Sequence, residues 1–142
     1  MRLIFASSMH AIDGDPEAVL VFPEIRTWPK NLYGVSNFYS ENVGKYFALT
    51  AGLPTICLRI GPCIPLDMNV QLSEHEMKAY INPDELNQLI VECLESHIPY
   101  SIVHATSQNR RMRKDLTSSI CAFDYHPQTD RFEIDQFKAP TE

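Results

Sequence analysis

The chain has few glycines and fewer basic than acidic residues, and both scarcities exclude classes of protein. Its 5 glycines are scattered over 142 residues, so they cannot form the closely spaced glycine-rich turn that holds the phosphates of a dinucleotide. The 12 lysines and arginines are outnumbered by 18 aspartates and glutamates, which gives a formal net charge of -6. This charge argues against binding to nucleic acid through phosphate contacts, so we expect no nucleic-acid partner.

Long apolar runs and metal-binding motifs are also missing. No run approaches the length needed to cross a membrane, so we expect no membrane partner. The 4 cysteines have no C-x-x-C spacing and three of them lie in apolar runs, which is typical of buried, reduced thiols in a cytoplasmic protein. The 5 histidines do not form an H-E-x-x-H motif, so we predict no metal site.

The sequence does contain an alternation of strand and helix patterns. Its length favours a single domain over residues 1–142 with a sizeable core. Strands that alternate with helices pair in parallel, so the order predicts an α/β fold with right-handed crossovers. The predicted elements are strands at Arg2–Ser8, Pro54–Ile60 and Tyr100–His104, and helices at Leu32–Ala51, after Asn82 and at Asp115–Phe123, with a helical turn in Leu72–Lys78 and a polar, peripheral tail from Tyr125.

The helix predicted at Leu32–Ala51 is the most informative element. Gly52 is placed to end it in a left-handed conformation, and Pro54 prevents its continuation. Tyr33 and Asn37 lie four residues apart and project from a common face. A tyrosine in this position is compatible with core packing or with a catalytic phenol. The apolar residues recur at helical spacing and predict a buried stripe, which consists of Leu32, Val35, Phe38, Tyr39, Val43, Tyr46 and Leu49.

Three segments converge on one edge of the predicted sheet. Ser8 ends the first strand, and the turn Gly61–Cys63 follows the second. A long loop over residues 9–31 connects Ser8 to the helix that carries Tyr33, and loops of this length tend to be functional. Open α/β sheets bind ligands beyond the carboxyl ends of their strands, so we expect the functional site at this edge.

The chain resembles, in the order and spacing of its motifs, the second half of an extended short-chain dehydrogenase/reductase. The branch that it resembles most is the NAD-dependent epimerase/dehydratase group, particularly its uronate-dehydrogenase-like members. The resemblance implies a partial Rossmann-like parallel sheet with flanking helices, lacking the N-terminal dinucleotide-binding half. The segments that carry it cover nearly the whole chain and are Phe5–Ala11, Leu32–Ser36, Cys57–Gly61, Asn82–Leu86, Asp115 and Tyr125–Gln128.

This resemblance implies an NAD(P)-dependent sugar epimerase, dehydratase or dehydrogenase, with NAD or NADP as cofactor and a sugar or sugar acid as substrate. Tyr33 would be the acid/base for hydride transfer, and Ser8 would hydrogen-bond the substrate oxygen. His10 and Met9 would contact the substrate. The implied cofactor-binding residues are Asn37, Ile60, Gly61, Pro62 and Cys63.

Three departures from the family pattern bear on activity. Asn37 stands where the family has a lysine, whose charge favours the phenolate form of the tyrosine, and an amide carries no charge. The glycine-rich turn is absent, so we expect the isolated chain to bind a dinucleotide poorly and to have impaired activity or none. No arginine lies between Arg59 and Arg110, so no guanidinium clamp for a sugar carboxylate is evident.

Two other interpretations remain open. The first is a non-catalytic interaction or scaffold protein derived from the same family. In that protein, the apolar edge of the first strand would pair with a partner or with a second copy in a homo-oligomer. In the enzyme, the missing N-terminal half would be supplied by another polypeptide or by sequence upstream of Met1. The second is a small α/β domain in which Ser8 and Tyr33 only satisfy local hydrogen bonds.

Overall fold

The computed structural model describes residues 1–14, 20–24, 28–68 and 70–138. Residues 15–19 and 25–27 of the predicted loop therefore lie outside the described residues.

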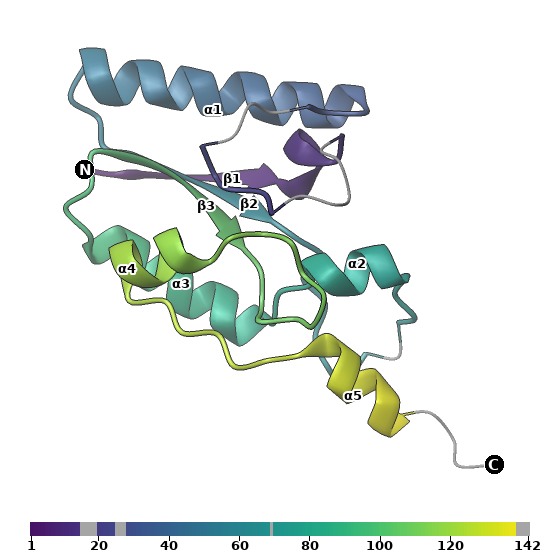
Figure 1. The fold of residues 1–142 in the computed structure, drawn as a ribbon. Coiled ribbons are helices and arrows are strands. Elements are labelled where there is room, and N and C mark those ends of the chain that lie inside the picture. The colour runs from purple at the N-terminus through teal and green to yellow at the C-terminus, as the bar shows by residue number, and fades with distance from the viewer. Residues whose placement is uncertain (15–19, 25–27, 69, 139–142) are drawn as a thin grey trace.

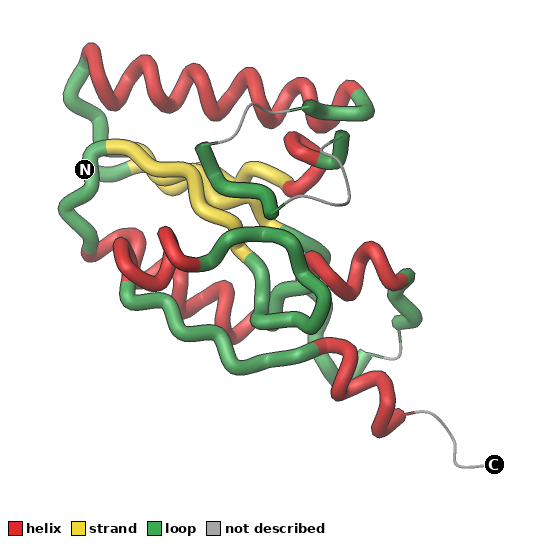
Figure 2. The backbone as a smooth tube through the Cα atoms, in the orientation of Figure 1, coloured by secondary structure: helices red, strands yellow, loops and turns green. Residues whose placement is uncertain are grey.

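A three-stranded parallel sheet forms the centre of the molecule (Figure 2). Its strands are β1 (Leu3–Ser8), β2 (Thr55–Ile60) and β3 (Tyr100–Ala105), in that spatial order. β2 is buried along almost its whole length because it pairs on both sides, whereas β1 and β3 are edge strands among the described residues. The three predicted strands and the α/β class are confirmed, although Leu3 and Ala6 of β1 are exposed, in a strand that was expected to be buried.

Helices cover both faces of the sheet (Figure 1). On one face lies α1 (Leu32–Thr50), and on the other lie α3 (Pro83–Glu95) and α4 (Thr117–Phe123). The short elements near the carboxyl ends of the strands are η1 (Met9–Ile12), α2 (Glu74–Ala79) and α5 (Arg131–Lys138). None of the helices in the described ranges is long and apolar enough to span a membrane.

The two crossover connections have opposite hands. The steps from β1 to β2 and from β2 to β3 run in the same direction, but α1 and α3 lie on opposite faces of the sheet. The expectation of right-handed crossovers is therefore wrong for one of them. The second connection is long and folds back on itself before α3 begins, and Ile81 N–H donates to the Pro62 carbonyl at 3.0 Å within it.

The main core lies between the sheet and α3. Asn82 caps this helix as predicted, since its side chain accepts from Asp84 N–H at 3.0 Å. Leu89 and Cys93 are fully buried, whereas Leu94 is 52% exposed. Successive side chains of an α-helix are rotated by about 100° about its axis, so Leu94 points away from the face that carries Cys93. The buried cluster comprises Ile56, Leu58, Ile81, Leu89, Cys93, Val103, Ala105, Phe123 and Tyr125.

The cysteines divide into two buried and two exposed thiols, all unpaired. Burial raises the pKa of Cys57 and Cys93 to about 12, so both remain neutral. Cys63 and Cys121 are exposed, contrary to the expectation of buried thiols.

Helix α1 buries its small and polar face rather than its apolar stripe. Its buried residues are Gly34, Asn37, Glu41, Gly44 and Ala48. The members of the predicted stripe are exposed except for the half-buried Val43. The helix lies so close to the sheet that a Cβ at Gly44 would come within 2.9 Å of Thr55 Cγ2. Glycine is therefore required where α1 crosses β2.

A buried ion pair selects this face of α1. The carboxylate of Glu41 accepts from Arg59 Nε at 2.9 Å and from Nη2 at 2.8 Å, and both side chains are 1% exposed. Ser7 Oγ donates to the same carboxylate at 2.6 Å, and Tyr100 OH donates to the Glu41 carbonyl at 3.2 Å. Glu41 thus ties α1 to all three strands.

The segment after Tyr125 is not the polar, peripheral tail that was expected. Tyr125 is fully buried and its hydroxyl donates to the Thr106 carbonyl at 3.0 Å. The buried carboxylate of Glu85 accepts from the N–H groups of Gln128 and Thr129 at 2.6 and 2.8 Å. This contact spans more than 40 residues, so local hydropathy could not reveal it. It anchors the approach to α5.

His104 is a buried titratable group on β3. Burial, reinforced by the nearby charges of Arg59 and Lys114, lowers its pKa to about 3. The ring is therefore neutral in the folded chain at neutral pH.

The buried ion pair predicts a large stability difference between matched variants. Glu41→Gln should lower the free energy of unfolding by about 3–5 kcal/mol, because it leaves the Arg59 guanidinium buried without its charge partner. Glu74→Gln removes one member of an exposed pair with Lys78 and should change stability little. Denaturant unfolding measures both. Equal losses in the two variants would contradict this account.

His104 predicts an acid-dependent loss of stability. The unfolded chain protonates this ring near pH 6.5, whereas the folded chain keeps it neutral to about pH 3. Below pH 6.5 the unfolded state binds more protons, so the free energy of unfolding should fall by up to about 1.4 kcal/mol per pH unit. His104→Leu should flatten this fall between pH 6.5 and 4, and the exposed His97→Leu should not. Identical slopes in the two variants would contradict the prediction.

Candidate functional site

The carboxyl edge of the sheet brings Ser8 and His10 together. Ser8 is the last residue of β1 and the N-cap of η1, and its Oγ accepts from His10 N–H at 3.3 Å. Because Oγ acts there as an acceptor, its own hydrogen remains available for another group. Ser8 is 8% exposed and lies directly beneath the start of η1.

Tyr33 lies against the same edge. It is the second residue of α1, whose N-cap Asn31 accepts from Gly34 N–H at 2.7 Å. Tyr33 is 59% exposed, and its ring makes an edge-to-face contact with the His10 ring, with centroids 5.6 Å apart. A Cβ at Gly34 would lie 2.2 Å from the His10 carbonyl oxygen, so η1 and α1 approach closely at this glycine. The structure therefore brings the rings of His10 and Tyr33 into contact, and their predicted roles toward a substrate stay predictions.

Asn37 is buried one turn after Tyr33. It is 6% exposed, and its Nδ2 donates to the Tyr33 carbonyl at 2.9 Å. This bond holds the amide against the helix backbone, and the amide supplies no positive charge to the phenol.

Met9 and the turn after β2 also lie near this edge. Met9 is buried, whereas the turn is half-buried to exposed. Met9 is 6% exposed and packs with Ile12, Val21 and Ala79, so its predicted contact with substrate stays a prediction. The turn follows the end of β2, with Ile60, Gly61 and Pro62 half-buried and Cys63 exposed.

Gly61 packs against α2, since a Cβ there would lie 1.6 Å from the Ala79 carbonyl oxygen. Partial burial raises the pKa of Cys63, so its thiol is not an activated nucleophile. The turn therefore offers backbone groups rather than reactive side chains.

Asp13 is a site residue that sequence reasoning missed. Its carboxylate bonds to His10 Nδ1, and its other oxygen lies 3.8 Å from Nε2 of His75 on α2. The only sequence signal was the spacing of three residues between His10 and Asp13, which places two side chains on one side only if the segment is helical. Within the described ranges, no group of three or more His, Cys, Asp or Glu side chains could hold a metal ion.

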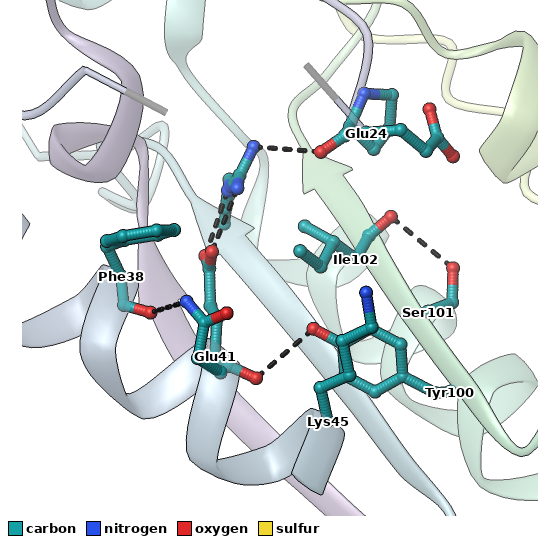
Figure 3. A pocket seen from close by; sticks show the side chains of 10 residues that line it. Glu24, Phe38, Glu41, Lys45, Tyr100, Ser101 and Ile102 are labelled. Carbon is teal, nitrogen blue, oxygen red and sulfur yellow. Dashed lines mark hydrogen bonds and ion pairs between the residues drawn. The ribbon is translucent and has the colours of Figure 1, made fainter. Parts of the chain in front are cut away.

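A cavity of about 640 Å³ lies elsewhere, between α1 and β3 (Figure 3). Phe38, Glu41 and Lys45 line it from α1, and Tyr100 and Ile102 line it from β3. The Glu41 carboxylate at its wall is already paired with Arg59. None of the predicted site residues lines this cavity, so the candidate chemistry lies at the sheet edge instead.

Comparisons with known proteins give a consistent set of relatives, although no family model matches the chain. It is 32% identical over 89 residues to a uronate dehydrogenase of Agrobacterium fabrum, covering 63% of this chain and 32% of that protein. It is 30% identical over 149 residues to an L-arabinose 1-dehydrogenase (NAD(P)(+)) of Haloferax volcanii, covering 89% of this chain and 58% of that protein.

The crystal structure of a uronate dehydrogenase from Agrobacterium tumefaciens has the same fold. It superposes with a TM-score of 0.80 at 26% identity, covering 99% of this chain and 53% of that one. The chain spans about half the length of the curated relatives it matches. The superposition confirms the predicted partial Rossmann-like sheet with flanking helices. The sequence relatives and the superposition therefore confirm the resemblance to uronate-dehydrogenase-like members of the extended short-chain dehydrogenase/reductase family, over about half of their length.

Proposed function

We propose that this chain is the C-terminal, substrate-side half of an NAD(P)-dependent sugar dehydrogenase or epimerase. The observation that carries the proposal is the meeting of Ser8, His10 and Tyr33 at the carboxyl edge of the sheet. Relatives named as uronate dehydrogenase and L-arabinose 1-dehydrogenase (NAD(P)(+)) support a sugar or sugar acid as the substrate class.

In this proposal, Tyr33 exchanges a proton with the substrate hydroxyl. Its exposure of 59% leaves the ring accessible from the edge of the sheet. Ser8 Oγ accepts from the His10 backbone, so its hydrogen can be donated to the substrate oxygen. The ring of His10 lies next to Tyr33 at the same edge of the sheet.

The residues present fit one end of a dinucleotide. Asn37 uses its NH₂ group on the Tyr33 carbonyl, which leaves its oxygen as an acceptor for a ribose hydroxyl. The turn from Ile60 to Cys63 offers backbone groups at the same edge of the sheet. When bound, the nicotinamide would accept the hydride that leaves the sugar carbon. The sequence has no glycine-rich turn, so this chain lacks the element that would hold the phosphates of the dinucleotide.

The missing contacts would come from an N-terminal half that pairs along β1. This strand has an unpaired outer edge among the described residues, and four of its six residues are apolar. A parallel strand on that edge would extend the sheet and cover an edge that otherwise favours aggregation.

Fusion of the dinucleotide-binding half of the Agrobacterium uronate dehydrogenase in front of Met1 tests this function. The fused chain should reduce NAD with a uronate or L-arabinose, slowly because Asn37 supplies no charge. Tyr33→Phe should lower turnover by about 100-fold or more, whereas the exposed Tyr39→Phe should not. Equal turnover of the two variants would remove Tyr33 from the proton-transfer role.

Asn37→Lys in the same fused chain tests the reason for slow turnover. A lysine one turn after Tyr33 would favour the phenolate, so turnover should rise by about tenfold or more and the pH optimum should move downward. Steady-state rates across pH measure both effects. An unchanged pH profile would contradict the assignment of Tyr33 as acid/base.

A second candidate function is non-catalytic association through α1. The exposed stripe includes Leu32, Tyr39 and Tyr46, which recur every seven residues, together with Val35 and Leu49. This spacing is typical of helices that pack on one another. The stripe lies on the side of α1 opposite its buried face, so a helix of a second copy could cover it.

Light scattering after size-exclusion chromatography tests association. The wild-type chain should elute as a dimer, and Tyr39→Ser with Tyr46→Ser should shift it toward monomer because the stripe loses apolar area. Val91→Ser with Leu94→Ser changes exposed apolar residues of α3 and serves as the matched control. A wild-type monomer, or equal effects of both pairs, would contradict this function.

A further inference from the structure

We propose that His10, held by Asp13, accepts a proton from Tyr33 and so takes over the role of the lysine that this chain lacks at position 37. The inference rests on the proposed function and adds a proton acceptor to the same site. It starts from a hydrogen-bonded pair that neither the motifs nor the relatives' names point to.

The short helix η1 sets the geometry of the pair. A 3₁₀ helix has three residues per turn, so the side chains of His10 and Asp13 project on one side of the segment. The Asp13 side chain is 18% exposed and bonds to His10 Nδ1, while the His10 side chain is 51% exposed. A carboxylate can only accept, so Nδ1 carries a hydrogen and Nε2 of a neutral ring is left as the acceptor.

The pair is fixed next to the phenol by the backbone. Ser8 Oγ accepts from His10 N–H, and the close approach at Gly34 holds η1 on the first turn of α1. The rings of His10 and Tyr33 are in edge-to-face contact with an interplanar angle of 74°. The phenol ring is therefore in contact with an imidazole, whereas Asn37 is uncharged and bonded to the helix backbone.

The charged and titratable groups around His10 are consistent with this role. Asp13 lies on the Nδ1 side, and Tyr33 of α1 contacts the ring. His75 of α2 lies 3.8 Å from Asp13, so two imidazoles share one carboxylate. The carboxylate stabilises positive charge on His10 when the ring takes a proton.

The proton steps balance with the oxidised dinucleotide as the hydride acceptor. Tyr33 gives its hydroxyl proton to His10 Nε2 and becomes a phenolate, while Asp13 balances the imidazolium charge. The phenolate then takes the hydroxyl proton of the sugar as the hydride leaves the sugar carbon. His10 releases its proton to water, and both side chains return to their starting forms.

Nitrogen-15 NMR of the histidine rings in the full chain tests the pair without any activity. Neutral His10 should carry its hydrogen on Nδ1, and Asp13→Ala should shift the population toward Nε2–H. His126 is an internal control, because its Nε2 lies 2.9 Å from Asp124 and should carry the hydrogen there instead. A His10 ring protonated on Nε2 in the wild-type chain would overturn the proposal.

Carbon-13 labelling of the tyrosine rings tests the link to the phenol. The Tyr33 Cζ signal should change over the pH range in which the His10 ring titrates, and this change should be lost in His10→Gln. The exposed Tyr39 should show no such change in either chain. A Tyr33 signal that is the same with and without His10 would show that the rings only pack.

The fused chain separates failure of this inference from failure of the proposed function. With the acceptor in place, His10→Gln should alter the pH profile of turnover and not only its size. An active fused chain with an unaltered profile would overturn the role of His10 and leave the proposed function intact. An inactive fused chain whose NMR signals behave as expected would overturn the proposed function.

Discussion

The buried ion pair between Glu41 and Arg59 is the interaction on which the rest of the structure depends. Burying two charges is costly, and it stabilises a fold only when their hydrogen-bonding groups are satisfied. Here the carboxylate accepts two bonds from the guanidinium and one from Ser7, and the helix backbone accepts one from Tyr100. These contacts fix the rotation of α1 about its axis, because any other rotation would leave Arg59 buried without a charge partner.

This rotation determines both candidate functions of the chain. With Glu41 facing the sheet, Gly34 meets η1 and Tyr33 lies beside His10 at the carboxyl edge. The same rotation turns the apolar stripe, including Tyr39 and Tyr46, away from the sheet. A site at one end of α1 and an interaction surface along its outer side therefore have a common physical cause.

Much of the fold could be predicted from local patterns, but the orientation of α1 could not. Branched apolar runs located the strands, and the Asn82 cap located the start of α3. Hydropathy alone assigned the wrong face to α1, because the pairing of Glu41 with Arg59 joins residues 18 positions apart. The contacts of Glu85 with Gln128 and Thr129 were hidden for the same reason.

The meeting of Ser8 with the helix that carries Tyr33 was predictable, since sheet topology brings strand ends to one edge. The contact of Asp13 with His10 could not be predicted, because it depends on a short 3₁₀ turn that local patterns did not indicate.

The central claim is that the ion pair turns the polar face of α1 toward the sheet. Nuclear Overhauser effects between α1 and the sheet test this claim most directly. The account predicts cross-peaks from the Gly44 α-protons to the Thr55 methyl group, together with contacts between the rings of Tyr33 and His10. It predicts none from the rings of Tyr39 or Tyr46 to Thr55. Cross-peaks from either of those rings to the Thr55 methyl group would show that the apolar stripe faces the sheet and would contradict the account.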